Sequence, residues 1–163
     1  MELWDAYDKN ENKLGIDIER GAWIAKGMYH LVCEILVQHK DGNYLVMQRD
    51  WKKESWPGRF EGTAGGSALK GENPRQCALR ELKEETGIEV NTIKEIYHEV
   101  TERSIHHGFY CITDCPKDSV ILQEGETIRY KWLTPKKFRE LVESEQFVPT
   151  QRQRLRPFLS QTE

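Results

Sequence analysis

The sequence lacks the features that mark several large classes of protein. Its longest apolar stretches, such as residues 35–37, fall far short of the roughly 20 apolar residues that a membrane-spanning helix needs. Its first ten residues, MELWDAYDKN, are acidic where a secretory signal peptide has a basic start and an apolar run. No internal repeat, low-complexity tract or linker rich in proline, glycine and serine divides the 163 residues. We therefore expect a single cytoplasmic domain over residues 1–163, without membrane contact.

An excess of positive charge is also missing. The chain has 24 Lys and Arg residues against 27 Asp and Glu residues, which gives a formal net charge of −3. A protein whose main task is to bind a nucleic-acid backbone usually carries a basic excess. The composition therefore disfavours polymeric nucleic acid as a partner.

Cysteine is scarce, with four residues and no pair in the C-x-x-C arrangement. Cys111 and Cys115 are a candidate metal site together with His106 or His107, but their spacing matches no common zinc pattern. The other two cysteines lie in apolar segments. We therefore expect reduced thiols that pack as small hydrophobic side chains.

Strand and helix patterns follow one another along the chain. Helices are predicted for residues 74–86 and 135–144 and for a last segment capped by Thr150. The turn at Asp41-Gly42 favours a hairpin between the strands on either side of it. This order indicates an α/β fold with a mixed sheet and helices on both of its sides. Strands are predicted for residues 29–38, 44–49, 93–101, 108–113 and 128–133, with a short strand around 60–64.

Residues 1–20 precede this pattern as an amino-terminal hairpin extension. Two short strands flank a polar turn, and Gly15 helps the chain to reverse. An exposed edge strand can pair with a second chain, so this hairpin is a candidate homodimer contact.

The helix over residues 74–86 carries an acidic face. Asn73 and Pro74 favour its start, and Gly87 favours a left-handed stop at its end. Side chains three and four apart share a helical face, which brings three glutamates together; they are Glu81, Glu84 and Glu85. Each such pair of like charges destabilises a bare helix by about 0.2–0.5 kcal/mol. A divalent cation would turn this repulsion into attraction, because carboxylates are the hard oxygen ligands that Mg²⁺ and Mn²⁺ prefer.

The spacing around these glutamates is that of a known motif. Residues 66–88 read G-x5-E-x7-R-E-U-x-E-E-x-G-U, where U is an aliphatic residue. This segment resembles the Nudix box and matches every position of the signature. A chance match in a chain of this size is on the order of one in ten million or rarer. The chain is accordingly identified as a member of the Nudix hydrolase family.

The resemblance implies a Nudix-type α/β/α sandwich with a mixed β-sheet and Mg²⁺ (or Mn²⁺) as cofactor. Its metal ligands would be the three box glutamates and the backbone carbonyl of Gly65, and Glu84 would also be catalytic. Arg80 would orient the carboxylates, with Glu72 in support, and Gly66 would permit close approach of the backbone. Most members hydrolyse a nucleoside diphosphate linked to another moiety. The expected partner is therefore a small-molecule nucleoside diphosphate derivative or another organic pyrophosphate.

A general base is needed as well, because water must lose a proton as it attacks phosphorus. In this family the base is often a glutamate in a loop outside the box, and sometimes one within it. The loop over residues 119–132 offers Glu124 and Glu126. Glu126, six residues before Trp132, is the preferred candidate for both the base and a further metal ligand.

Candidate substrate residues lie in the long loop over residues 49–72, and loops of that length are usually functional. Arg49 and Arg59 are candidates for phosphate contact, and Trp56 for stacking on a base. Further candidates of the same kinds are Lys52, Lys53, Trp51 and Phe60, together with His30 and the pair His106-His107.

Two other functions are compatible with the fold. The segment WDAYDKNENKLG and the strand that starts YHLV resemble the isopentenyl-diphosphate isomerase-like branch of the family. That isomerase requires a catalytic cysteine beside the loop that precedes the box, where this chain reads GTAGGS over residues 62–67. A binding module that has lost hydrolysis would be expected to lack one of the box glutamates, all of which are present. Hydrolysis is therefore expected, with isomerisation as the alternative.

Overall fold

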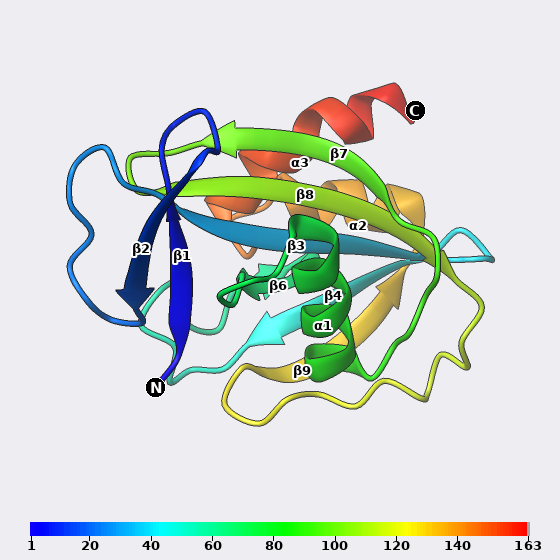
Figure 1. The fold of residues 1–163 in the computed structure, drawn as a ribbon. Helices are drawn as coiled ribbons and strands as arrows, with labels where there is room; N and C mark the ends of the chain where they lie inside the picture. The colour runs from blue at the N-terminus through cyan, green and yellow to red at the C-terminus, as the bar shows by residue number, and fades with distance from the viewer. Residues whose placement is uncertain (163) are drawn as a thin grey trace.

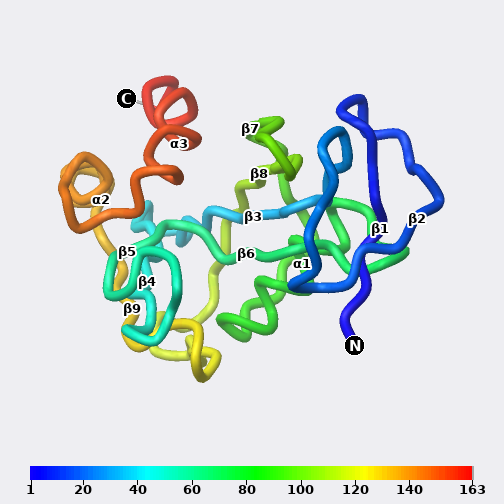
Figure 2. Tube along the Cα trace, turned by 90° about the vertical axis from the view of Figure 1, so that its left-hand side faces the viewer, coloured from blue at the N-terminus to red at the C-terminus, as the bar shows by residue number. Residues whose placement is uncertain are grey.

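The computed structural model describes residues 1–162 and places a mixed β-sheet between two helical layers (Figure 1). Helix α1 (Pro74–Thr86) covers one face of the sheet, and α2 (Pro135–Val142) and α3 (Pro149–Gln161) lie on the other, as Figure 2 shows. This is the predicted α/β/α arrangement. The strands of the sheet are β3 (His30–His39), β4 (Tyr44–Arg49), β5 (Phe60–Glu61), β6 (Thr63–Ser67), β7 (Lys94–Val100), β8 (Ser104–Thr113) and β9 (Thr127–Leu133).

Strand β3 gives the sheet its mixed character. It runs parallel to β8 over its whole length and antiparallel to β6. It meets β4 only at Gln38 and Tyr44, after which the two strands diverge. Strand β4 pairs instead with β5 and β9. The predicted hairpin around Asp41-Gly42 is therefore present only next to its turn, because β6 takes the place of β4 beside β3.

Apolar side chains on both faces of β3 build two cores. Residues 31, 33, 35 and 37 face α1, where Leu82 is fully buried. Leu36 faces α2 and α3 and packs in one cluster with Phe138 and Leu155. Full burial of a Leu or Phe side chain is worth roughly 1.5–3 kcal/mol, so these contacts hold the helical layers on the sheet.

Local signals set the bounds of α1 as the sequence predicts. The side chain of Asn73 accepts a hydrogen bond from the backbone N–H of Gln76 at 2.8 Å, and the side chain of Gln76 accepts one from the N–H of Asn73 at 2.9 Å. This capping box satisfies two backbone donors at the helix start. At the other end, Gly87 has φ of 77° and donates its N–H to the carbonyl of Lys83. The helix packs on β6 and β3, which fixes the position of the Nudix box.

The amino-terminal extension forms a separate two-stranded sheet, as predicted. Strands β1 (Leu3–Tyr7) and β2 (Lys13–Glu19) pair in antiparallel fashion. Two backbone hydrogen bonds between Tyr7 and Tyr29 attach the hairpin to the segment that enters β3. Leu14 and Ile16 on β2 are 40% and 48% exposed, so the predicted dimer edge is open to solvent in this chain.

Two predicted bounds are wrong. Helix α3 begins at Pro149 and its N-cap is Val148, so Thr150 is not the cap. Proline at the first helical position sets this start without a side-chain cap. Strand β8 begins at Ser104 rather than at residue 108, because its pairing with β3 and β7 continues through the polar residues 104–107. Within residues 1–162, no helix has the length and apolar composition needed to cross a membrane.

Candidate active site

A cleft opens beside β6, where the Nudix box meets the loop after β4 and the loop before β9. The first of its two adjoining hollows extends toward β3, β5, β8 and α3, and the second toward α1 and the amino-terminal hairpin. The fold thus brings segments that are distant in the sequence to one site. The residues that line both hollows are Lys53, Gly65, Gly66, Glu85 and Glu126.

The three box glutamates line the second hollow but differ in burial. Glu81 and Glu85 are 9% and 5% exposed, whereas Glu84 is exposed. Nη1 of Arg80 lies 2.8 Å from Oε1 of Glu81 and 3.1 Å from Oε2 of Glu84. Oε2 of Glu85 lies 3.4 Å from the backbone N of Gly65, which donates to it. The acidic face expected from the sequence is present, with a guanidinium between two of its carboxylates.

Arg80 is the positive centre of this face. Its Nε and Nη2 donate to the two carboxylate oxygens of Glu72 at 2.6 and 3.0 Å, which is a bidentate pair. The hydrogen bonds with Glu72 raise the pKa of Arg80 above its ordinary value. Burial pushes the pKa of Glu72 upward, but hydrogen bonds from Arg80 and from the N–H of Leu69 outweigh it and hold that pKa below its ordinary value. Both residues are therefore charged, in the positions that the resemblance implies.

Gly65 and Gly66 are required by the space around them. A Cβ atom at Gly65 would lie 2.4 Å from the carbonyl oxygen of Cys33 and 2.8 Å from Cα of Glu34, both on β3. A Cβ atom at Gly66 would lie 2.6 Å from Oε1 of Glu81. Since Cβ atoms do not tolerate such distances, any other residue at position 66 would displace this carboxylate. Close approach of the backbone at Gly66 agrees with the expectation from the box.

The middle of the cleft gathers negative charge. Burial, and then the carboxylates of Glu61, Glu81 and Glu126, raise the pKa of Glu85 well above its ordinary value. Burial raises the pKa of Glu61 to about 7, although the Arg49 guanidinium opposes the shift. Burial also raises the pKa of Glu81. Carboxylates that repel one another in a desolvated site form a hard oxygen donor set, and such a set fits Mg²⁺ or Mn²⁺.

The two candidate bases before β9 differ in position. Glu126 is half-buried and lines both hollows, whereas Glu124 is exposed and lines neither. Oε2 of Glu126 lies 2.5 Å from Nζ of Lys53, and the backbone carbonyl of Glu126 accepts a hydrogen bond from the N–H of Asp50 at 2.9 Å. The loop after β4 therefore holds Glu126 against the cleft. This placement favours Glu126 over Glu124.

Two of the three predicted substrate residues line the cleft. Arg49 donates from Nη1 to Glu61 at 2.9 Å and from Nε and Nη2 to the carbonyl of Ser55 at 3.0 and 2.8 Å. Trp56 is 38% exposed at the cleft and has φ of 51°, a backbone conformation that a bulky residue adopts only when its surroundings impose it. Arg59 does not line the cleft, and its guanidinium lies 5.2 Å from the centre of a Trp56 ring. The geometry therefore gives Arg59 contact with Trp56 in place of the predicted phosphate contact.

The further substrate candidates divide in the same way. Lys53 lines the cleft, whereas Lys52 and Trp51 are exposed outside its lining. Phe60 is buried in the core on the α2–α3 side. His30 stacks on Trp4, with 4.3 Å between ring centres, and does not line the cleft.

Of the predicted pair His106-His107, only His106 lines the cleft, at the far end of the first hollow, where it meets two residues that sequence reasoning missed; they are Glu34 and Arg154. Oε1 of Glu34 lies 2.7 Å from Nδ1 of His106 and 3.6 Å from Nη1 of Arg154. Glu34 is buried, and a carboxylate in the middle of an apolar strand was a usable signal. No comparable signal marked Arg154, because it is one of several arginines on α3 and only packing turns it to the cleft.

Glu61 was also missed, although its position contained a signal. Residues at spacing two along a strand share a face, so Glu61 and Thr63 belong to the same face as Gly65. All three line the first hollow. The alternation is obscured because the sequence of residues 49–72 has no clean period and predicts one long loop with a short strand around 60–64.

The cysteines take no part in the cleft. All four thiols are free, and Cys115 is half-buried while the other three are buried, as expected. Within residues 1–162, no cysteine lines the cleft. The alternative site at Cys111 and Cys115 is not formed, because ring nitrogens of His106 and His107 are bound to glutamates instead.

Comparison with known proteins agrees with the box and the fold. The family model of the NUDIX domain matches residues 28–156. An uncharacterized Nudix hydrolase of Listeria innocua is 34% identical over 91% of this chain and 89% of its own length. The isopentenyl-diphosphate Delta-isomerase of Corynebacterium diphtheriae is 28% identical over 72% of this chain and 70% of its own. The crystal structure of DR0079 from Deinococcus radiodurans shares the fold, with a TM-score of 0.74, 18% identity, and coverage of 95% of this chain and 98% of that one. The chain therefore belongs to the Nudix hydrolase family, a family of pyrophosphohydrolases that generally use divalent metals.

Proposed function

We propose that this protein is a metal-dependent pyrophosphohydrolase that cleaves a P–O–P bond in a nucleoside diphosphate derivative or a related organic pyrophosphate by attack of water on phosphorus. The observation that carries the proposal is the convergence of carboxylates from three segments on the cleft beside Gly65; they are the buried Glu61, Glu81 and Glu85 and the half-buried Glu126. In the absence of a cation, their mutual repulsion costs folding free energy. Carboxylates with raised pKa values that converge in a cleft are typical of a functional site.

The residues of the Nudix box would have two roles: some would bind the metal, and others would hold these ligands in position. Glu81, Glu84 and Glu85 would hold the metal, with the carbonyl of Gly65, and Arg80 would orient Glu81 and Glu84 through the contacts at 2.8 and 3.1 Å. A divalent cation bound there neutralises phosphate oxygens and lowers the pKa of water. Glu72 holds the guanidinium of Arg80 through its bidentate pair, so it would act on the ligands only through that side chain.

Glu126 would accept the proton from the attacking water and contribute a further ligand atom. Its carboxylate faces both hollows and is paired with Lys53, so the carboxylate is held in place while ionised. A phosphate that enters the cleft competes with Glu126 for the Lys53 ammonium, which would free a carboxylate oxygen to accept a proton.

Substrate contact would come from the loop after β4. Lys53 and Arg49 carry the positive charge next to the carboxylates, and Trp56 offers an aromatic face at the cleft for a nucleoside base. Arg59 would act on substrate only by supporting Trp56. The buried hydroxyl of Thr63 has no hydrogen-bond partner within residues 1–162, so it is available to a bound substrate.

The isomerase alternative is less well supported by the cleft. The similarity to an isopentenyl-diphosphate isomerase covers 72% of this chain at 28% identity. That chemistry needs a cysteine at the reacting carbon, and none of the cysteines in residues 1–162 lines the cleft. Migration of the double bond of isopentenyl diphosphate without phosphate release would overturn the hydrolase proposal.

A screen for P–O–P hydrolysis with Mg²⁺ and Mn²⁺, in which chromatography identifies the phosphomonoester or pyrophosphate products, tests the proposal. The panel is ADP-ribose, dinucleotide polyphosphates, nucleotide sugars, coenzyme A and oxidised nucleoside triphosphates. On the substrate found, Glu84→Gln should cut turnover by orders of magnitude and leave the melting temperature within about 2 °C, because Glu84 is exposed. Glu102→Gln, at a carboxylate whose side chain is 87% exposed, is the matched control and should retain full activity. Full activity of Glu84→Gln would refute the assignment of the metal site.

A further inference from the structure

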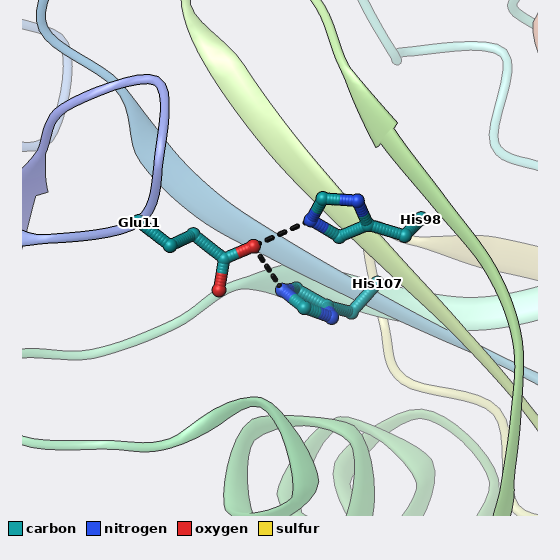
Figure 3. Close-up of side chains that lie close together, drawn as sticks. All are labelled: Glu11, His98 and His107. Atoms are coloured by element: carbon teal, nitrogen blue, oxygen red, sulfur yellow. Dashed lines mark hydrogen bonds and ion pairs between the residues drawn. The ribbon is translucent and has the colours of Figure 1, made fainter.

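A second cluster of ligating side chains lies between the amino-terminal hairpin and the β7–β8 pair (Figure 3). Oε1 of Glu11 lies 2.6 Å from Nε2 of His98 and 2.8 Å from Nε2 of His107. The three ligand atoms all lie within 4.8 Å of one another. None of these residues lines the cleft, so the cluster is not part of the hydrolytic site.

The sheet brings the two histidines together. His98 on β7 and His107 on β8 are directly opposite in the antiparallel register, and their ring centres are 4.8 Å apart. Directly opposed residues share a face of the sheet. Both imidazoles therefore project to the same side, toward the hairpin that carries Glu11.

A β-bulge adds a fourth side chain to the same face. The register of β7 shifts between Glu95 and Tyr97, so Glu95 is opposite Phe109 while His98 is opposite His107. Without the bulge, Glu95 and His98, three residues apart, would project to opposite faces. With it, Oε1 of Glu95 lies 2.7 Å from Nδ1 of His107. This is the arrangement in which an outer carboxylate orients a metal-binding imidazole.

The turn of the hairpin holds Glu11 in place from the other side. Oδ1 of Asp8 accepts hydrogen bonds from the backbone N–H groups of Asn10 and Asn12 at 2.8 and 2.9 Å, and Glu11 has φ of 62°. The conformation of Glu11 is left-handed, which costs free energy for a residue with a side chain. The turn thus presents the Glu11 carboxylate to the histidines at some expense in stability.

Both ring nitrogens of His107 face carboxylate oxygens, at 2.7 and 2.8 Å. A cation bound at Nε2 would take the place of the hydrogen bond to Glu11, while Nδ1 would keep its bond to Glu95.

We propose that Glu11, His98 and His107 bind a transition-metal dication such as Zn²⁺. The bound ion connects the amino-terminal hairpin to the β7–β8 pair. Two imidazoles and one carboxylate are a donor set for zinc and related borderline metals, while Mg²⁺ prefers oxygen ligands alone. His98 is half-exposed, so the fourth position of a tetrahedral ion is open to water. Glu95 is a positioning residue that acts through His107.

The ligand atoms lie within 4.8 Å of one another and must shift to accept the ion. Bond lengths of about 2.0–2.2 Å to zinc place ligand atoms roughly 3.3 Å apart in a tetrahedral site. The carboxylate oxygen of Glu11 must therefore retreat from each Nε2 by several tenths of an ångström. The side chains of Glu11 and His98 are 28% and 49% exposed, so rotation about their side-chain bonds can supply these shifts while the backbone of the turn and the buried His107 stay in place.

Titration of the full-length, untagged protein with Co²⁺ tests the proposal. The protein is stripped with a chelator and kept in excess Mg²⁺, so that the box carboxylates are occupied by an ion without visible absorption. The wild type should bind one equivalent of Co²⁺ with the intense visible band of a four-coordinate site that contains nitrogen ligands. One equivalent of Zn²⁺ should abolish this band. His98→Gln and Glu11→Gln should lose the band, and Glu95→Gln should weaken Co²⁺ binding by about 10–100-fold.

His39→Gln is the matched control, because Nδ1 of His39 also lies near a carboxylate, 3.2 Å from Asp41, but outside the cluster. It should keep the full band. Circular dichroism of each variant without metal should match that of the wild type, which separates loss of a ligand from loss of the fold. Absence of the band from the wild type would show that the cluster is only a hydrogen-bonded ion pair. Persistence of the band in His98→Gln would place the ion elsewhere, and either result overturns the proposal.

Discussion

Replacement of Glu61 by glutamine should make the metal-free protein more stable. Glu61 is 7% exposed in the cleft, and its carboxylate is paired with Arg49 at 2.9 Å. Burial nevertheless raises its pKa from 4.5 to about 7, so the Arg49 guanidinium does not compensate fully for the lost hydration. Glutamine has nearly the same shape and no charge to desolvate. Glu61→Gln therefore removes the free-energy cost of burying a carboxylate charge and keeps the packing of the side chain.

The size of the effect follows from the shift in pKa. A rise from 4.5 to about 7 corresponds to about 3 kcal/mol of difference between the neutral and ionised forms in the folded protein. A carboxyl whose pKa is raised by folding binds its proton more tightly in the folded state, so stability falls as pH rises through this window. At pH 8 the cost is fully present. For a domain of this size, about 3 kcal/mol is worth roughly 6–12 °C in melting temperature.

Thermal unfolding of wild type and Glu61→Gln in chelator, at pH 8 and at pH 4, measures this difference. The variant should melt higher at pH 8, and the gap should nearly close at pH 4, where Glu61 is protonated in the folded wild type and mostly protonated in the unfolded chain. Glu102→Gln, at an exposed carboxylate, should melt with the wild type at both values. An equal or lower melting temperature of Glu61→Gln at pH 8 would show that the buried carboxylate does not destabilise the fold, and a gap that persists at pH 4 would assign the gain to packing.

Three further outcomes concern the same cleft. Glu126→Gln should lower kcat by about 10²–10⁴-fold with little change in KM, since glutamine cannot accept the proton; a change confined to KM would make Glu126 a binding residue. Gly66→Ala should raise the Mg²⁺ concentration needed for half-maximal activity, because its Cβ would lie 2.6 Å from Oε1 of Glu81, and an unaltered Mg²⁺ titration would contradict the packing argument. Without divalent metal, the melting temperature should rise as pH falls from 8 toward 5, because burial and neighbouring carboxylates raise the pKa of Glu85 and the folded state binds the proton more tightly. Saturating Mg²⁺ should flatten that slope in a thermal shift assay, and identical slopes with and without Mg²⁺ would count against metal binding at these carboxylates.

The parts of the fold with local signals could be predicted from the sequence. Helix α1 begins and ends as predicted because its bounds depend on side chains next to them, namely Asn73, Pro74 and Gly87. Strand β4 was also predicted with its observed bounds, as the strand that follows the turn at Asp41-Gly42. Pairing was less predictable, because the choice between β4 and β6 as neighbour of β3 depends on how the whole sheet closes.

The candidate site shows the same division. Spacing within one helix identified Glu81, Glu84 and Glu85, because helical geometry alone decides which residues share a face. The polar group of Glu34, His106 and Arg154 joins strands β3 and β8 with α3. Glu34 stands out in an apolar strand, but nothing in the sequence shows which distant residues it contacts. Trp56 and Arg59 are only three residues apart, yet Trp56 lines the cleft and Arg59 lies outside it. The backbone at Trp56 is left-handed, a conformation that the sequence does not predict.

Arg80 reconciles the burial of the box glutamates with a stable metal-free fold. Its guanidinium contacts Glu72, Glu81 and Glu84, so these three carboxylates have a permanent cation of the protein's own. Glu85 has no cationic partner within residues 1–162. Its hydrogen-bond donor is the backbone N–H of Gly65 at 3.4 Å, and burial with neighbouring carboxylates raises its pKa well above the ordinary value. The negative charge that Arg80 does not compensate therefore lies at Glu85, on the side of the acidic face of α1 nearest to Gly65 and Glu126. A divalent cation gains most by binding there, at the junction of the two hollows, where a diphosphate would also meet Lys53.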